Sequence, residues 1–493
     1  MAASDGVERH YPKPPVRTLA SLAFCAALDA ADFSMIPGMF TAFSDDFGAS
    51  LSDIGLMYLL QCLVGACAMP VWGGLGDRMS RKNLLCIGCF TWGLFTLGCA
   101  TAQSFMAFTM FRTLAAVFMS LVSPIAQSVV ADLVPSKTRG SLFGQIGFFA
   151  MLGAFVGQFA STSLSDGYVG GMRGWRFCLL VVGGLSVVWP FVMIFLMVEP
   201  NRDRAIALAR HANNGSSLNI DWPSLRLYSF WLLVLQGIFG CMPWRAFGMF
   251  SILWLQLIGF SDFQVAIIGG AGMIAGAIGH LFAGYIGDYS HSILPYRGRV
   301  YVAQFTVAIG MFMVFFLLVL LPKTPNMAVF LSVIIGFNLT ATWASNATNR
   351  PLVADIVPEW SRASIYSYFT MMESVPSSFA GYFVSYLAES VFGFKMAGHG
   401  HHQDVSDLTP EERAENVASL TNALVIMTMV PWVLCFGAYG LMHYTYEKDV
   451  LKTKKRLEKA SLAAGSPSEL ALDDDEEIDG LEKVNLLAEG RRG

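Results

Sequence analysis

Two short stretches of this chain decide its fold, and each of them occurs twice. The stretch ADLVPSKTR at residues 131–139 recurs as ADIVPEWSR at residues 354–362, and GGLGD at residues 73–77 recurs as GYIGD at residues 284–288. Both copies of the longer stretch follow one long apolar run and open another. Two unrelated signals repeated in the same order indicate an internal duplication, so we expect two related halves.

The composition places these halves in a membrane. Of the 493 residues, 54% are hydrophobic and 14% are charged, against roughly 25% charged residues in soluble domains. A soluble enzyme and a disordered scaffold are therefore excluded. The net charge of −4 gives no basic field for phosphate backbones, so nucleic acid is not an expected partner. Because no metal-ligand spacing and no phosphate-cradling glycine loop is present, we expect no metal, no cofactor and no ATP-driven pump.

The apolar runs are long enough to cross a bilayer, which takes about 20 mostly apolar residues per helix. Lys and Arg gather in the loops on one side of these runs and at both ends of the chain, which predicts cytoplasmic termini and an even number of spans. We predict twelve spans, near residues 18–40, 53–76, 83–102, 105–132, 140–163, 175–198, 227–257, 263–286, 299–321, 327–355, 362–388 and 418–446.

A polar stretch between the sixth and seventh spans marks the joint between the halves. Behind the last span a basic run at residues 452–456 is expected to continue a helix, whereas the acidic run at residues 473–477 is typical of disorder. The predicted organisation is a cytosolic N-terminal tail (1–17), a six-helix bundle (18–198), a cytosolic linker (199–226), a second six-helix bundle (227–446) and a cytosolic, partly disordered C-terminal tail (447–493).

The loop GGLGDRMSRK at residues 73–82 resembles the signature G-x-L-x-D-R-x-G-R-K of the major facilitator superfamily, with Ser80 in place of a glycine. Arg112 matches the fourth-span arginine of that family. The resemblance implies an all-α membrane protein with twelve transmembrane helices in two pseudo-symmetric six-helix bundles. Within the superfamily the chain is most similar to the Spinster-like group and its plant and protist relatives, on QGIFGCMPW (236–244), NATN (346–349) and ESVPSS (373–378).

Ionisable residues inside apolar spans mark the candidate site. Each costs roughly 2.5–3.5 kcal/mol at the middle of a membrane, so such residues are turned to a water-filled path and paired. The resemblance implies that the first, fourth, seventh and tenth spans line a central cavity, and most of the candidates lie there. The candidate substrate- and proton-binding residues are Asp29, Asp32, Arg112, Trp244, Arg245, Asn346, Asn349, Arg350 and Glu373.

Asp29 and Asp32 lie three residues apart and therefore on one helical face. Two close carboxylates resist being ionised together, so one of them can carry a coupling proton. The alternative is that one carboxylate pairs structurally with an arginine. Arg112, Arg245 and Arg350 are permanently charged, which favours an anionic or zwitterionic solute unless all three are paired with carboxylates.

Charged residues also gather at the predicted cytoplasmic ends of the helices. The resemblance implies that they form ion-pair networks between the bundles, closed in one state and broken in the other. Solvated charges that set the topology are the alternative, but they do not explain the duplicated aspartates. The candidate latch residues are Gly73, Asp77, Arg78, Arg81, Lys82, Asp132, Arg139, Asp288, Arg297, Arg299, Asp355 and Arg362.

Together these features predict a secondary active transporter, coupled to protons, that moves an organic anion or an amphipathic, lysolipid-like solute by alternating access. A facilitative uniporter without proton coupling and a non-transporting membrane sensor of the same fold stay open as alternatives, whereas an enzyme is not expected. The expected partners are a small solute, protons and the lipid bilayer, and we expect a monomer. A dileucine-like motif at residues 482–487 leaves plasma and endolysosomal membranes both open.

Overall fold

The computed structural model describes residues 16–49, 51–134, 138–165, 167–199, 221–394 and 409–463. This part of the chain is helical apart from its loops and one short hairpin of β1 (Tyr168–Val169) and β2 (Met172–Arg173). The predicted tails and linker fall largely outside the described residues, at 1–15, 200–220 and 464–493, as does the dileucine-like motif.

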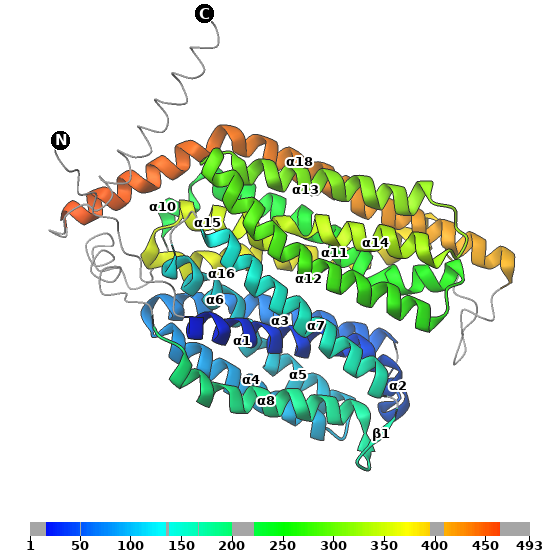
Figure 1. The fold of residues 1–493 in the computed structure, drawn as a ribbon. Helices are drawn as coiled ribbons and strands as arrows, with labels where there is room; N and C mark the ends of the chain where they lie inside the picture. Colours follow the sequence, from blue (N-terminus) through cyan, green and yellow to red (C-terminus); the bar gives the residue numbers. More distant parts are fainter. Residues whose placement is uncertain are drawn as a thin grey trace, which may run out of the picture.

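Two helical bundles lie side by side, and in Figure 1 the half of the chain coloured from blue to bluish green lies below the half coloured from green to red. The first bundle contains α1 (Val16–Met35), η1 (Ile36–Met39), α2 (Phe40–Phe47), α3 (Leu51–Arg78), α4 (Arg81–Thr101), α5 (Phe105–Met119), α6 (Val122–Leu133), α7 (Arg139–Leu164) and α8 (Gly174–Leu196). The second contains α10 (Trp222–Leu225), α11 (Tyr228–Ile258), α12 (Asp262–Ile293), α13 (Gly298–Phe315), η3 (Phe316–Leu320), α14 (Met327–Ala341), η4 (Ala344–Asn349), α15 (Arg350–Ile356), η5 (Glu359–Ser361), α16 (Arg362–Ser377), α17 (Ala380–Tyr386), η6 (Leu387–Val391) and α18 (Pro410–Ala463).

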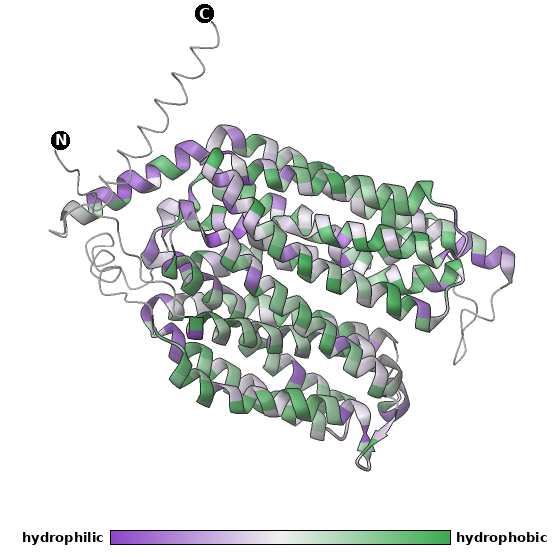
Figure 2. Cartoon of the chain, viewed as in Figure 1, coloured by the Kyte–Doolittle hydropathy of each residue, from purple (hydrophilic) through white to green (hydrophobic). Residues whose placement is uncertain are grey.

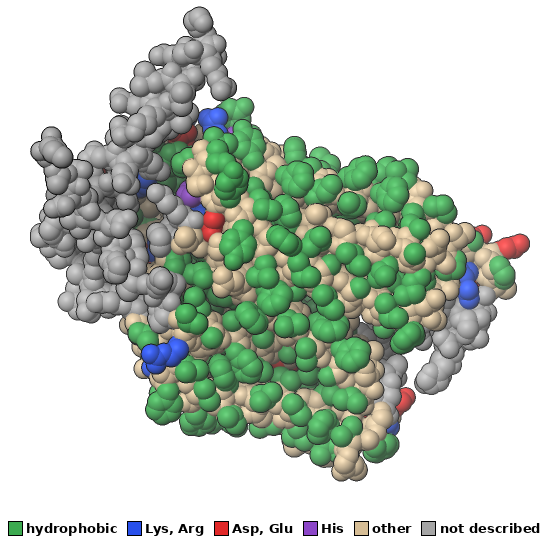
Figure 3. All heavy atoms as spheres, viewed as in Figure 1, with side chains coloured by type: hydrophobic (Ala, Val, Ile, Leu, Met, Phe, Trp, Pro, Cys, Tyr) green, Lys and Arg blue, Asp and Glu red, His purple; other side chains and the backbone are tan. Residues whose placement is uncertain are grey.

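Within the described residues, ten helices are long and apolar enough to cross a membrane. The predicted tenth and eleventh spans are instead assembled from shorter pieces, α14–η4–α15 and α16–α17–η6. Hydrophobic residues colour the outer faces of both bundles in Figure 2, and in Figure 3 charged side chains stand out at the two ends of the visible face. This distribution is that of a multi-pass membrane protein.

The break in the tenth predicted span lies directly before Pro351. Proline has no N–H to give to the carbonyl one turn earlier, so a regular helix cannot run through this position. The chain responds with the wider turns of the π-helix η4, which ends at Asn349. Pro351 therefore accounts for the change of helix type beneath the polar residues of this span.

The last helix extends beyond the predicted twelfth span, from Pro410 to Ala463. The basic run at residues 452–456 continues the helix as predicted. Arg456 pairs with Asp221 through both guanidinium Nη atoms, one of them 2.7 Å from the carboxylate. The end of the linker is thereby attached to the C-terminal part of α18.

Glycines let helices cross closely, both within a bundle and between the two bundles. A Cβ atom on Gly153 of α7 would lie 2.1 Å from the carbonyl oxygen of Ala27 in α1. Between the bundles, a Cβ on Gly144 of α7 would lie 2.4 Å from the carbonyl oxygen of His280 in α12. Small residues at such crossings let membrane helices approach closely, so these two glycines serve packing.

Gly153→Ala is expected to lower the free energy of unfolding by about 1–3 kcal/mol, because the new methyl group meets a backbone atom that cannot rotate away. Thermal unfolding of the purified protein in detergent measures the loss. Gly184→Ala is the matched control, since nothing lies within 4 Å of a Cβ at that helical position. Equal melting temperatures for the two variants would contradict the close crossing of α1 and α7.

Candidate functional site

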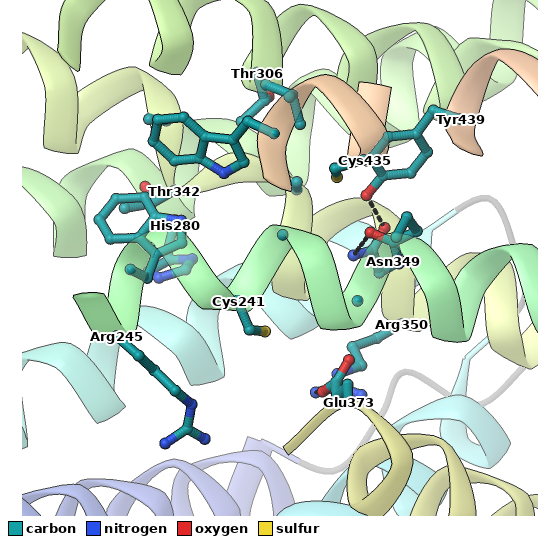
Figure 4. A pocket seen from close by; sticks show the side chains of 18 of the residues that line it. Cys241, Arg245, His280, Thr306, Thr342, Asn349, Arg350, Glu373, Cys435 and Tyr439 are labelled. Carbon is teal, nitrogen blue, oxygen red and sulfur yellow. Dashed lines mark hydrogen bonds and ion pairs between the residues drawn. The ribbon is translucent and has the colours of Figure 1, made fainter. Parts of the chain in front are cut away.

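A cavity of about 350 Å³ lies in the second bundle, lined by residues of α11, α12, α13, α14, η4, α15, α16 and α18. Among its described lining residues, Met151 of α7 alone comes from the first bundle. Five predicted site residues line it: Trp244, Arg245, Asn349, Arg350 and Glu373. Figure 4 shows Arg245 and His280 on one side of the cavity, Arg350 and Glu373 on the other, and Cys241 between them.

The remaining predicted site residues do not line this cavity. Asp29, Asp32 and Arg112 belong to the first bundle. Asn346 lies in η4, beside the cavity-lining Ala344 and Asn349, but its side chain is outside the described part of the structure. The structure thus separates the predicted site into a cavity in one bundle and a charged cluster in the other.

Hydrogen bonds and one ion pair connect the polar side chains at one end of the cavity, although the buried Nε of Arg350 has no partner among the described atoms. Arg350 forms an ion pair with Glu373 at 3.0 Å and donates to the hydroxyl of Thr370 at 3.3 Å. Asn349 donates to Gln236 of α11 at 3.3 Å and accepts from the hydroxyl of Tyr439 of α18 at 2.6 Å. This end therefore holds a charge-balanced ion pair and a fixed amide.

Arg245 differs from Arg350 because no carboxylate of the described residues lies within ion-pair distance of it. It projects from α11 into the cavity, near Tyr58 and Cys62 of α3 in the first bundle. A guanidinium group stays charged at any physiological pH. With Glu373 ionised and paired, the cavity therefore carries one uncompensated positive charge.

In the first bundle, Asp32 and Arg112 form an ion pair in which both side chains are fully buried. Asp32 also accepts hydrogen bonds from the indole N–H of Trp92 at 2.9 Å and the hydroxyl of Thr96 at 2.8 Å. Arg112 donates to Gln61 at 3.1 Å and to the carbonyl oxygen of Asp32 at 3.0 Å. Each group is thus held by several partners, an arrangement typical of a structural pair.

Asp29 lies one turn before Asp32 and is only half-buried. Its carboxylate makes no hydrogen bond or ion pair with any side chain or backbone group in the described ranges. Of the two aspartates that the sequence singled out, Asp32 is therefore the one locked to an arginine, and Asp29 is the one whose carboxylate is available.

At the end of the molecule where α1 begins and α18 ends, each bundle caps a helix of the other. Asp77, at the end of α3, accepts hydrogen bonds from the backbone N–H groups of Ala363 and Ser364, at 3.1 and 2.9 Å. Asp288 of α12 accepts from the backbone N–H groups of Gly140 and Ser141, at 2.9 and 2.7 Å. Carboxylates satisfy the free N–H groups of a helix N-terminus and complement its dipole.

Arginines from both bundles reinforce these caps. Arg139 of α7 pairs with Asp355 of α15 at 2.7 Å, and Arg362 of α16 pairs with Asp132 of α6. Within the bundles, Asp132 also pairs with Arg81, whereas Arg299 lies 3.1 Å from both Asp288 and Asp355. Of the other latch candidates, Gly73 packs against α16, Arg78 and Arg297 are exposed, and Lys82 donates its backbone N–H to Glu199.

Sequence reasoning missed the backbone donors of the caps, although a signal was present. Arg139-Gly140-Ser141 and Arg362-Ala363-Ser364 directly continue the duplicated stretches at 131–139 and 354–362. If the alignment of the two duplicated stretches is extended by two residues, it includes the N-termini of both capped helices. Gln236 and Tyr439 were missed as well, since neither is ionised at neutral pH and the sequence gives no sign that they meet Asn349.

Comparison with known proteins adds to this geometry. Residues 22–397 match the family model described as Major Facilitator Superfamily. The chain is 28% identical to human protein spinster homolog 1 over 233 residues, which are 46% of this chain and 41% of that protein. It therefore spans less than half the length of this relative. It is 25% identical to the cis,cis-muconate transport protein of Acinetobacter baylyi over 341 residues, 66% of this chain and 77% of that protein.

Solved structures with a similar fold include a bacterial homolog of the human lysosomal transporter Spinster, in an inward-facing and unoccupied conformation. The TM-score is 0.61 at 18% identity, over 89% of this chain and 98% of that one. A proton:xylose symporter bound to 6-bromo-6-deoxy-D-glucose gives a TM-score of 0.62 at 13% identity, over 84% and 96%. The predicted major facilitator fold and the predicted resemblance to spinster proteins are confirmed, whereas the number of twelve spans stays a prediction.

Proposed function

The chain belongs to the Major Facilitator Superfamily, and from this premise we propose that it is a proton-coupled secondary transporter of small organic anions. The solute binds in the cavity of the second bundle. The caps and ion pairs between the bundles close one end of the path and open when the bundles rock. By the distribution of Lys and Arg in the sequence, this closed end faces the cytoplasm.

Arg245 is the observation that carries the choice of an anion. An unpaired charge inside a membrane protein is costly, and an anionic solute would compensate it on binding. Arg350 does not compete for the same solute, because Glu373 already neutralises it. The muconate transport protein, to which this chain is similar, is named for an organic anion, and this supports the same class.

Asp29 is the carboxylate proposed to carry the coupling proton. Asp32 is unsuited to this role, since protonating it would leave Arg112 without a counter-ion in a fully buried position. Asp29 has no such partner to lose among the described residues. Its place one turn from Asp32 means that the charge on Asp32 disfavours a second negative charge nearby.

Arg245→Ala is expected to weaken binding of an organic anion by about 10- to 100-fold, the value of the charge-assisted hydrogen bonds that are lost. A thermal-shift screen of organic anions on the purified protein identifies an anion that binds. The carboxamide of that anion, which has the same shape and no charge, serves as the neutral analogue. The amide should lose much less affinity in the same variant. Equal losses for the anion and the amide would remove the reason for assigning an anionic solute.

Asp29→Asn is expected to abolish uptake driven by an imposed pH gradient in proteoliposomes while counterflow exchange, which needs no driving force, continues. Uptake that still responds to the gradient would exclude Asp29 as the proton carrier. If the wild-type protein shows exchange but no response to pH, it is a uniporter. If it binds a solute and never exchanges it, it is a sensor.

A further inference from the structure

An aromatic corner forms one wall of the cavity. The ring of Trp244 stacks on Phe337, with centroids 4.9 Å apart and an angle of 25° between the planes. Trp432 lies 6.4 Å from Trp244 at 73°, close to perpendicular. Trp244 and Trp432 both line the cavity, whereas Phe337 is buried behind them. Because the two indoles are nearly perpendicular, a flat ring can stack on one of them and make an edge-to-face contact with the other.

His280 of α12 lines the same cavity and has an unsatisfied nitrogen. The residue is 6% exposed, and its buried Nδ1 has no hydrogen-bond partner among the described atoms. The hydroxyl of Thr342, which lies beside His280 in Figure 4, donates to the carbonyl oxygen of Asn338 at 2.9 Å, and it makes no hydrogen bond with this nitrogen. A buried polar atom left without a partner is costly, so a ligand that supplies one gains affinity.

The cavity volume limits the size of the solute. Proteins enclose small molecules in pockets of roughly 300–1,000 Å³, and about 350 Å³ is near the lower end of that range. A solute with a long acyl chain does not match a cavity of this size. A compact solute does, and the aromatic wall favours one with a flat, conjugated body over a saturated one.

Resting on the transport of organic anions proposed above, we infer that the substrate is a compact, planar carboxylate with a second polar group on its conjugated body. The carboxylate binds Arg245, the conjugated body lies against Trp244 and Trp432, and the second polar group hydrogen-bonds the imidazole of His280. A neutral imidazole has one donor and one acceptor, so a phenolic hydroxyl or a carbonyl suits it. His280 thereby favours planar carboxylates that carry the second polar group, and Arg245 favours a negatively charged solute.

Three probes test this assignment on the full-length protein in detergent or nanodiscs: 4-hydroxycinnamate, cinnamate and 3-cyclohexylpropionate. Equilibrium binding is expected to rank them in that order, with about three- to tenfold between neighbours for the lost hydrogen bond and the lost aromatic contact. His280→Phe is expected to remove the preference for 4-hydroxycinnamate and leave the affinity for cinnamate within about twofold. His280→Gln, which keeps hydrogen-bonding capacity, is expected to restore part of the preference.

His443→Gln is the matched control, because His443 lies on α18 outside the cavity and contacts Gln304. This variant should keep the wild-type order of affinities. The inference is overturned if none of the carboxylates binds at millimolar concentration, if cyclohexylpropionate equals cinnamate, or if His280→Phe keeps the preference. Should His280→Phe not fold, the wild-type ranking and His280→Gln decide.

Counterflow exchange separates this inference from the proposed function. If 4-hydroxycinnamate binds but is not exchanged, the proposal of transport is wrong and the proposed class of ligand stands. Exchange of a saturated or long-chain anion, with no binding of the planar probes, would defeat the ligand class and keep transport. Binding and exchange of 4-hydroxycinnamate, both sensitive to His280→Phe, support the two proposals together.

Discussion

Asp32→Ala is expected to lower the free energy of unfolding by about 3–5 kcal/mol, because it leaves the fully buried Arg112 without its counter-ion. The indole of Trp92 and the hydroxyl of Thr96 lose their acceptor at the same time. Denaturant or thermal unfolding in detergent, followed by size-exclusion chromatography, measures the effect. We expect this variant to be the least stable of the single substitutions described.

Asp29→Ala provides the comparison, since the same residue type on the same helix face loses no ion pair in the described structure. Its stability should stay within about 0.5 kcal/mol of the wild type. Adding Arg112→Met to Asp32→Ala should recover much of the loss, because removing both charges of a buried pair is far less costly than removing one. Equal stability for Asp29→Ala and Asp32→Ala would contradict the assignment of Asp32 as structural.

Asp288→Ala is expected to raise the equilibrium ratio of separated to closed bundles at the capped end by about 10- to 100-fold. The reason is that each charge-assisted hydrogen bond is worth about 1.5–3 kcal/mol. The variant removes the acceptor of the N–H groups of Gly140 and Ser141 and frees one contact of Arg299. Spin labels at the exposed positions 78 and 297, one on each bundle, report the distance across this end. The more accessible native cysteines, Cys62, Cys67 and Cys241, are replaced beforehand.

Asp77→Ala should shift the same distances, since Asp77 caps α16 in the way that Asp288 caps α7. Glu415→Ala is the control, because Glu415 is an exposed carboxylate near the opposite end of α18. A distance distribution that stays at the wild-type value in both cap variants would show that the caps do not hold the bundles together.

The fold followed from the sequence because its determinants are local. The length of each apolar run predicts a membrane-spanning helix, and the duplicated stretches around Asp77 and Asp288 predict two related halves. The break at η4 has a local cause as well, because Pro351 follows it directly and cannot donate a backbone hydrogen bond. The partners of the two aspartates did not follow, because a backbone N–H group is the same in every residue type except proline and leaves no mark in the sequence.

The site was only partly predictable, because pairing depends on tertiary contacts. Charge inside an apolar span identified Asp32, Arg245 and Arg350 as special, but all three arginines of these spans looked alike. In the structure Arg112 pairs with Asp32 and Arg350 pairs with Glu373, whereas Arg245 has no carboxylate partner among the described residues. His280 is also ionisable inside an apolar span, but it is only a weak candidate on sequence, since a lone histidine in an apolar helix is more often a packed residue than a ligand-binding one.

Disulfide cross-linking across the capped end tests the central claim, that the bundles must separate there for a solute to pass. In the pair Ser141→Cys and Asp288→Cys, the new thiols replace side chains whose oxygen atoms lie 2.6 Å apart on α7 and α12. Oxidation should stop counterflow exchange in proteoliposomes, and reduction should restore it. If the fully cross-linked protein still exchanges solute as fast as the same variant with free thiols, the central claim is wrong.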